Sequence, residues 1–350
     1  MQFVQVTPGA AWLNGRRAFL HLLAEAADAL GGRLELEAEF GHVGRFHAAS
    51  GETRPIFGNA LGLNPDSAAQ LAADKDYTAR LLAGQGIAVP RGMVLFSEAY
   101  RARMALKNRR VAAALPTTAE GEAFAERHGY PVIVKPNVGS EGRGVHRPAN
   151  LSELRGDLAA LFLSDDRIRL EECVPGIDTR LTVLDGAVRL AYRRLPPAVT
   201  GDGRQALERL VAHELRRLAA EHRGPKLSAE DPRIVRALAR QGWTYASVPP
   251  PGTVVRLLDS ANLSSGGHME DLTGRLPPEA EALAVKATAA LGLRLAGVDI
   301  LSTDLTKGLA GACVLEVNAS PGLDYYAHHG PGQWDRARAL VTDVLRSQTR

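Results

Sequence analysis

The stretch "VLEVNASPGLDY", Val314–Tyr325, places a carboxylate and an amide inside a run that otherwise has the composition of a buried strand. Side chains two positions apart in a strand point to the same face, so Glu316 and Asn318 face one side and the apolar residues beside them the other. Because burying an unpaired carboxylate is costly, this polar face requires water, a partner or a metal ion. A strand end whose polar face meets solvent is the simplest alternative, and the segment alone leaves both open.

A second strand-like segment, "LAGVDIL", places Asp299 among apolar residues, with a turn between it and the first segment. We expect the two segments to form adjacent strands. Their three oxygen-bearing side chains would then suit a hard cation such as Mg²⁺, whose coordination nucleotide phosphates and water could complete. A polar strand end is again the alternative for Asp299.

A glycine-rich loop follows a third strand-like segment in "VIVKPNVGSEGRGV", Val132–Val145. Glycines allow backbone N–H groups to approach phosphate oxygens closely, and Lys135 adds a positive charge. The lysine precedes the glycines, so the segment is neither a P-loop nor a dinucleotide-binding fingerprint. A flexible hairpin explains the glycines equally well.

The composition is that of a globular protein. The chain has 350 residues, enough for two or three domains, with 45% hydrophobic and 23% charged residues. No apolar run approaches the ~20 residues of a membrane span, and the N-terminus lacks the pattern of a secretion signal. The two cysteines are too few for a disulfide framework, and the net charge of +3 does not suggest a nucleic-acid binder. We therefore expect a cytoplasmic protein without membrane or nucleic-acid partners.

The order of helix and strand patterns predicts an α+β fold with more than one sheet. Helices are expected at Arg16–Leu30, from Pro65 continuously to Gly86, and at Pro277–Leu291. The basic segment Tyr100–Arg110 could bind phosphate or an acidic partner, but such a run is more often the solvated face of a helix.

The segments "YPVIVKPNVGSEGRGV", "LEECVPGIDTRL" and "AGVDIL…VLEVNASPG" together resemble the ATP-grasp ligases, and most closely the ATP-grasp domain of cyanophycin synthetases and bifunctional glutathione synthetases. The similarity extends from about Leu63 to Gly322. It implies an ATP-grasp fold in which two α+β subdomains grip ATP, preceded by a small N-terminal α/β domain. The implied boundaries are residues 1–72 for a substrate-side domain, 73–170 for the central lid subdomain, and 171–350 for the C-terminal subdomain, with a helical insertion near 202–245.

The resemblance also implies roles for individual residues. ATP phosphates would be bound by Lys75 and Lys135 under a lid loop that contains Ser140, Gly142 and Gly144. The adenine would lie against the backbone of Glu171, Glu172, Cys173 and Val174, with the ribose near Asp178. Two Mg²⁺ ions, for which Mn²⁺ could substitute, would be held by Asp299, Glu316 and Asn318. Asn262 and Ser264 belong to a loop that would close over the acyl phosphate.

The arginines are less clearly assigned. Arg180 and Arg194 could contact an anion, or could form surface ion pairs. The cyanophycin-type group commonly has an arginine at the position of Leu258, and Arg256, two residues earlier, would have to substitute for it.

The implied reaction activates a carboxylate with ATP to an acyl phosphate, which an amine attacks to form an amide, with release of ADP and phosphate. We expect an amino acid or a peptide as substrate. The chain has no room for the extra domains of cyanophycin synthetases, so we do not expect it to polymerise cyanophycin unaided. Many ATP-grasp ligases form dimers, so the resemblance also allows a homodimer. The alternatives are an ATP-grasp enzyme that modifies a peptide or protein, and an ATP-binding module without turnover.

Overall fold

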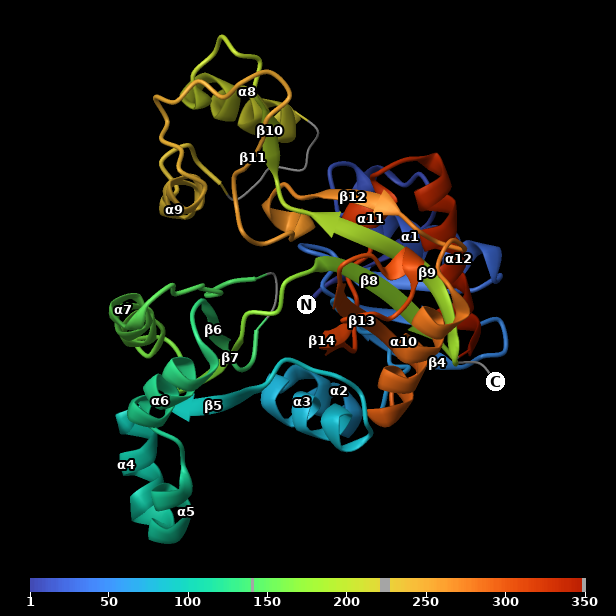
Figure 1. Cartoon of the computed structure of the whole chain (residues 1–350). Helices are drawn as coiled ribbons and strands as arrows, with labels where there is room; N and C mark the ends of the chain where they lie inside the picture. The colour runs from blue at the N-terminus through green and yellow to red at the C-terminus, as the bar shows by residue number, and fades with distance from the viewer. Residues whose placement is uncertain (140–141, 221–226, 348–350) are drawn as a thin grey trace.

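The structure is a computed structural model that describes residues 1–139, 142–220 and 227–347 (Figure 1). Within these residues it has four antiparallel sheets, each contacted by helices, and an insertion that forms a lobe of its own. None of the described helices is long and apolar enough to cross a membrane.

The N-terminal segment forms a four-stranded sheet in the order β1-β2-β3-β4. Its elements are β1 (Phe3–Val6), α1 (Ala18–Ala29), β2 (Arg33–Glu37), β3 (Val43–His47) and β4 (Thr53–Phe57), with a short 3₁₀ helix η1 (Ala11–Leu13). Helix α1 packs against the C-terminal helix α12 (Pro331–Ser347). Buried Leu22 and Leu23 belong to the same hydrophobic cluster as Val341 and Leu345, so the two ends of the chain share one core.

The expected helix between Pro65 and Gly86 is two helices, α2 (Asp66–Ala73) and α3 (Lys75–Gly84). The break falls at Asp74, whose extended backbone ends α2 and whose side chain accepts a hydrogen bond from the Tyr77 N–H at 3.0 Å. A carboxylate in this position satisfies a free donor of the new helix. The prediction of a continuous helix was therefore wrong, and the break places Lys75 at the first position of α3.

A three-stranded sheet with the order β5-β7-β6 forms the second unit. Its strands are β5 (Gly92–Phe96), β6 (Val132–Pro136) and β7 (Arg167–Glu172), and its helices are α4 (Glu98–Lys107), α5 (Arg109–Ala114), α6 (Thr118–His128) and α7 (Leu151–Leu161). Helices α6 and α7 contact the sheet, whereas α4 and α5 extend away from the rest of the molecule (Figure 1). Helix α4 has no buried residue, which confirms the solvated-face interpretation of the basic segment.

A five-stranded sheet in the order β12-β9-β8-β13-β14 lies at the centre. Its strands are β8 (Ile177–Leu184), β9 (Ala187–Leu195), β12 (His268–Asp271), β13 (Leu295–Ser302) and β14 (Cys313–Asn318). Helix α10 (Pro278–Ala290) packs on β8, β9 and β13. Strands β13 and β14 are hydrogen-bonded neighbours, so the predicted adjacency of the two acidic strands is confirmed.

The remaining elements include the insertion, with β10 (Ala198–Thr200), α8 (Leu207–Ala220), α9 (Pro232–Arg240) and β11 (Val254–Arg256), and the short helices η2 (Leu263–Ser265), η3 (Leu305–Lys307) and α11 (Asp324–Ala327). The insertion has its own small core, which includes Val199, Leu207, Ile234 and Leu258. In Figure 1 α9 of this lobe lies on the side of α7, and Arg236 of α9 is 3.9 Å from Asp157 of α7.

Candidate active site

One cleft of about 1220 Å³ is lined by the three-stranded sheet, the five-stranded sheet and the insertion. It brings together nearly all the residues named from the sequence. These are Lys75, Lys135, Gly142, Gly144, Glu171, Glu172, Cys173, Val174, Asp178, Arg180, Arg194, Arg256, Asn262, Asp299, Glu316 and Asn318. Ser140 and the side chain of Ser264 lie outside the described residues.

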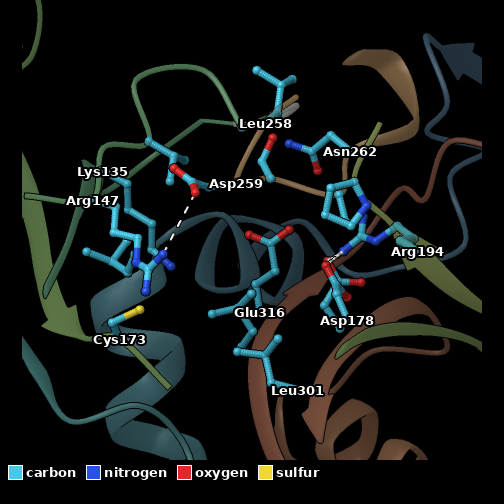
Figure 2. Close-up of a pocket in the computed structure, with 18 of the residues that line it drawn as sticks. Lys135, Arg147, Cys173, Asp178, Arg194, Leu258, Asp259, Asn262, Leu301 and Glu316 are labelled. Carbon is cyan, nitrogen blue, oxygen red and sulfur yellow. Dashed lines mark hydrogen bonds and ion pairs between the residues drawn. The ribbon is translucent and has the colours of Figure 1, made fainter. Parts of the chain in front are cut away.

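Strand pairing positions the three candidate metal ligands. Asp299 lies directly opposite Glu316 in the β13–β14 ladder, and Asn318 lies opposite Gly297. Residues opposite one another project from the same face of a sheet, so the two carboxylates are neighbours there. The Glu316 side chain is 29% exposed, accepts a hydrogen bond from Asn318 Nδ2 at 3.1 Å, and points into the cleft (Figure 2).

Asp299 is fully buried between two arginines. The Arg180 Nε donates to Asp299 Oδ1 and its Nη2 to Oδ2 at 2.7 Å, and the Arg194 Nη2 donates to the same Oδ2 at 2.7 Å. Arg180 and Arg194 are only 8% and 9% exposed, so the interpretation of these two residues as surface ion pairs was wrong.

Asp178 completes this cluster, since its Oδ2 accepts from Arg194 Nη2 at 2.5 Å while its Oδ1 is buried without a partner among the described residues. Burial raises the pKa of Asp178 to about 6. Burial also opposes the ionisation of Asp299, but Arg180 and Arg194 together hold the pKa of Asp299 below its usual range. Of these two carboxylates, Asp299 is therefore the one that remains ionised to lower pH.

The donor set fits a hard divalent cation. Carboxylate and amide oxygens are the ligand type that Mg²⁺ prefers, and Glu316 is accessible to the cleft. A cation at Asp299 would compete with two guanidinium groups for the same oxygens. Among residues 1–139, 142–220 and 227–347, no group of three His, Cys, Asp or Glu side chains is arranged to hold a metal, as expected for a set that has only two carboxylates and one amide.

The opposite wall of the cleft carries a buried ladder of charges. Lys135 Nζ pairs with Glu171 Oε1, and Arg169 Nε donates to Glu171 Oε2 at 3.3 Å. Arg169 Nη1 also donates to Asp76 Oδ1 at 2.5 Å. Neither Asp76 nor Arg169 was named from the sequence. They hold Glu171, which in turn fixes the ammonium group of Lys135.

Lys75 reaches the cleft from α3 and donates through Nζ to the carbonyl oxygen of Gly139 at 2.7 Å. Burial lowers the pKa of Lys75, an effect that Glu316 partly offsets. The two lysines therefore come from different elements, α3 and β6, and meet at the start of the glycine-rich loop. A polyphosphate bound here would stabilise the charged form of Lys75 and so offset the cost of its burial.

The glycine-rich loop meets the loop that contains Asn262. Gly142 has a φ of +67°, and a Cβ at this position would lie 2.0 Å from Asn262 Nδ2. Only glycine allows both this backbone conformation and this approach. The two segments expected to cover the phosphates and the acyl phosphate are thus in contact.

The link between the three-stranded sheet and the five-stranded sheet also lines the cleft. Strand β7 ends at Glu172, β8 begins at Ile177, and Cys173 and Val174 lie between them and line the cleft. Both residues lie beyond Glu172, the last residue of β7 that pairs with β6. Their backbone N–H and C=O groups are therefore outside the ladder, as a backbone contact to adenine requires.

The core of the insertion explains why position 258 holds a leucine and not an arginine. Leu258 is 3% exposed and belongs to the core of the insertion. Arg256 is exposed, lines the cleft, and is fixed by its backbone N–H, which donates to Gln241 Oε1 at 3.1 Å. A charge at position 258 would disrupt that core, whereas the exposed Arg256 lines the cleft.

Comparisons with known proteins agree with this geometry. Residues 259–330 match the RimK-like ATP-grasp domain. The chain is 33% identical over 284 residues to the cyanophycin synthetase of Trichormus variabilis, which covers 79% of this chain and 29% of that protein. It is 30% identical over 287 residues to the glutathione biosynthesis bifunctional protein GshAB of Enterococcus faecalis, covering 78% of this chain and 34% of that protein.

The crystal structure of a bifunctional glutathione synthetase from Pasteurella multocida superimposes with a TM-score of 0.57 at 21% identity, over 97% of this chain and 44% of that one. The chain thus spans about a third of the length of the curated relatives it matches. The predicted α+β architecture is confirmed. The chain has the ATP-grasp fold and is homologous to cyanophycin synthetases and to bifunctional glutathione biosynthesis proteins.

Proposed function

We propose that this chain is an ATP-dependent carboxylate–amine ligase. A substrate carboxylate takes the γ-phosphoryl group of ATP to form an acyl phosphate and ADP, and an amine then displaces phosphate to form an amide. The observation that carries this proposal is the meeting, in one cleft, of Lys75 and Lys135 with the Glu316–Asn318 edge of the central sheet. The sequence similarity to cyanophycin synthetase and to the glutathione biosynthesis bifunctional protein GshAB supports it.

The lysines act on the phosphates. Lys135 is pre-positioned by Glu171, so its ammonium group meets the triphosphate without reorganisation. Lys75 exchanges its hydrogen bond with the Gly139 carbonyl for a phosphate oxygen. Asp299, Glu316 and Asn318 would hold Mg²⁺, two ions in the full proposal with Mn²⁺ as a substitute. The bound metal would neutralise developing charge on the transferred group.

The loops exclude water. Contact between Gly142 and Asn262 closes the cleft above the phosphates, and water shut out here cannot hydrolyse the acyl phosphate. Arg256 lines the cleft, its guanidinium group forms no ion pair with the residues that the structure describes, and it takes the anion-stabilising role for which Leu258 is unsuited. Arg180 and Arg194 contribute through Asp299, whose charge they fix.

The substrates are an amino acid or a peptide on each side of the new bond. The amine must lose its proton before it attacks, and the acyl phosphate's own oxygens can take it. Residues 1–72, 73–170 and 171–350 remain the proposed division into substrate-side, lid and C-terminal units, and a homodimer the proposed assembly.

The test is nucleotide turnover with Mg²⁺ while amino acids are supplied singly and in pairs, with ADP and AMP separated by chromatography. We expect ADP and phosphate to appear only with a particular carboxylate and amine. Glu316→Gln is the matched control. It removes a proposed metal ligand from an accessible position and should therefore abolish ADP release. AMP as the product, or ATP binding without turnover with any amino acid or peptide, would contradict the proposal.

A further inference from the structure

Asn59 is a residue of the N-terminal unit that lines the cleft and that the proposed chemistry does not use. It lies just beyond β4, where the chain leaves the four-stranded sheet. Its Oδ1 accepts a hydrogen bond from Arg17 Nη2 at 2.5 Å. Because a guanidinium group can only donate, the atom that faces Arg17 is the amide oxygen, and the amide nitrogen Nδ2 is directed away from it.

Arg17 is itself held in place. It precedes α1, and its Nη2 also donates to Asp324 Oδ2 at 2.8 Å. The other oxygen of Asp324 accepts from the backbone N–H of Phe19 at 2.9 Å. Asp324 begins α11, a few residues after β14. The start of α1 and the start of α11 therefore together fix the orientation of the Asn59 amide.

The nitrogen of this amide lies beside the loop that follows the proposed metal-binding strand. A Cβ on Gly322 would be 3.5 Å from Asn59 Nδ2. The preceding Pro321 packs near Gly297, which is the residue opposite Asn318 in the ladder. Within residues 1–139, 142–220 and 227–347, Nδ2 donates to no acceptor. The amide thus presents an unused donor to the cleft close to the metal-binding edge.

A second asparagine of the same segment shows what a purely structural amide does here. Asn64 Nδ2 donates to the carbonyl oxygens of Leu295 and Ala319 at 2.7 and 2.8 Å. Its Oδ1 accepts from the backbone N–H groups of Arg294 and Leu295 at 2.8 and 3.0 Å. Asn64 therefore uses its full hydrogen-bonding capacity to join two segments, whereas Asn59 uses only its oxygen for this purpose.

We propose that Asn59 is a specificity-determining residue, which donates through Nδ2 to an acceptor oxygen of the acid substrate other than the carboxylate that is phosphorylated. The inference rests on the proposed ligase function and names its substrate class, an acid with a second acceptor oxygen near the reacting carboxyl group. That oxygen belongs either to the side chain of the acid or to an acyl group on its nitrogen. The donor serves both chemistries equally.

The acid is a better partner for Nδ2 than the amine. The reacting carboxylate must reach the γ-phosphate at the metal-binding edge, and Nδ2 lies beside the loop that leaves this edge. The amine must direct its lone pair at the acyl phosphate, and an N–H donor would compete for that lone pair. A hydrogen bond to the reacting carboxylate would likewise stabilise it before attack and slow the transfer. The second oxygen of the acid is the acceptor that carries neither cost.

The contact would select among acids. A site that donates to a substrate oxygen disfavours an analogue without it, because the donor is then left unpaired when water is displaced. Asn59 is half-buried in the free protein, so we expect about a tenfold effect, as for one ordinary hydrogen bond.

The test examines the acid by itself. Hydroxylamine replaces the unknown amine, displaces phosphate from the acyl phosphate and leaves a hydroxamate, which iron(III) colours. The common amino acids and their N-acetyl derivatives are supplied singly with ATP and Mg²⁺. We expect either more hydroxamate from asparagine than from leucine, which has nearly the same shape, or more from N-acetyl derivatives than from their parents. The first result would place the second oxygen on the side chain, and the second result would place it in an acyl group.

Asn59→Asp tests the residue. It keeps the shape and the acceptor for Arg17, but it replaces the donor that faces the cleft with a charged acceptor. The KM for the best acid should rise about tenfold, while the KM values for ATP and hydroxylamine and the Tm stay unchanged. Asn14→Asp is the matched control, because it makes the same change at an exposed position of the N-terminal unit that does not line the cleft, and it should alter none of these quantities.

Three results would overturn the proposal. The first is an equal KM for the acid in Asn59→Asp and in the unchanged protein. The second is a change in the KM for hydroxylamine instead of the KM for the acid. The third is equal reaction of acids with and without a second acceptor oxygen.

The ligase and the Asn59 contact fail in different ways. If no acid yields hydroxamate, the ligase is contradicted, and thermal unfolding with a non-hydrolysable ATP analogue and Mg²⁺ then tests the contact. An acid that raises the Tm of the unchanged protein but not of Asn59→Asp would support the contact, and acids that raise neither Tm would overturn it. Hydroxamate formed with the same KM in both proteins would support the ligase and overturn the contact.

Discussion

Asp299 and Glu316 are opposite each other in the β13–β14 ladder, yet loss of their charges should have very different effects on stability. Asp299 is fully buried and accepts hydrogen bonds from both Arg180 and Arg194. Asp299→Asn keeps the shape but leaves two buried guanidinium groups facing a neutral amide. Breaking a buried ion pair in this way costs about 3–5 kcal/mol of the free energy of unfolding.

Glu316 is in a different environment. Its side chain is 29% exposed, and its ion pair with Arg180 is 4.0 Å long. Exposed or long pairs contribute about 0–1 kcal/mol, so Glu316→Gln should unfold almost as the unchanged protein does. Both variants should lose ADP release, because each removes a carboxylate from the proposed metal site.

The assay is urea and thermal unfolding without Mg²⁺ or nucleotide, so that ligand binding does not contribute to the measured stability. For a chain of this size, 3–5 kcal/mol corresponds to a decrease of roughly 6–10 °C in Tm for Asp299→Asn. Asp343→Asn removes a carboxylate from ion pairs with Arg189 and Arg346 on the surface and serves as control. Equal Tm values for Asp299→Asn and Glu316→Gln would refute the view that the arginines depend on Asp299.

Three further changes probe the phosphate side of the cleft. Lys135→Met should weaken ATP binding about tenfold or more, as expected for loss of a charged hydrogen bond, whereas ATP affinity equal to that of the unchanged protein would argue against a phosphate contact. Because burial lowers the pKa of free Lys75 and phosphate would raise it, ATP binding should take up a proton at alkaline pH and weaken as pH rises; calorimetry in buffers of different ionisation enthalpy would detect this uptake, and Lys75→Arg should abolish it. Gly142→Ala should lower ADP release about tenfold, since its Cβ would collide with Asn262, while Gly156→Ala, which has open space around it, should not; equal rates would show that the loop contact does not matter for turnover.

The sequence was sufficient for the parts of the site that local patterns determine. The alternation in "VLEVNASPG" correctly placed Glu316 and Asn318 on one face of a strand, and the pairing of that strand with the one that carries Asp299 followed from their shared apolar pattern. The pair Asp185–Gly186 between two apolar runs is a pattern typical of a hairpin turn, and both residues have positive φ in the structure, as a tight hairpin requires.

Long-range charge pairing could not be predicted in this way. Arg169 contacts Asp76, 93 positions away, and Lys135 contacts Glu171, 36 positions away. No local period links such residues. The sequence showed Glu171 only as part of a segment that could contact adenine, whereas its side chain holds a lysine.

The helix break at Asp74 was missed for a related reason. Both flanking segments have good helix-forming residues, and an aspartate within such a run is typical of an exposed position on a continuous helix. In the structure Asp74 also accepts a hydrogen bond from Arg167 Nη1 at 2.9 Å, so a tertiary partner stabilises the cap. One indication was present in the sequence, because "DKDY" places a capping residue three positions before the Tyr77 N–H that it satisfies.

The two buried charge clusters suggest which side chains contact ligands and which hold others in place. Ion pairs as buried as Asp299–Arg180 and Glu171–Lys135 add little net stability compared with apolar packing, so their value must lie in the geometry they impose. In each cluster a buried arginine, Arg169 or Arg180, is satisfied by protein carboxylates and has little left to offer a ligand. The less committed groups are Lys75, whose ammonium donates, within the described part of the chain, to the Gly139 carbonyl, and Glu316, which is open to the cleft. A polyphosphate with its metal carries charge that complements both of these groups, and preorganised charges of this kind stabilise a transition state without a reorganisation cost. Under the proposed ligase function, the buried clusters would keep these groups in place for phosphoryl transfer before any ligand enters.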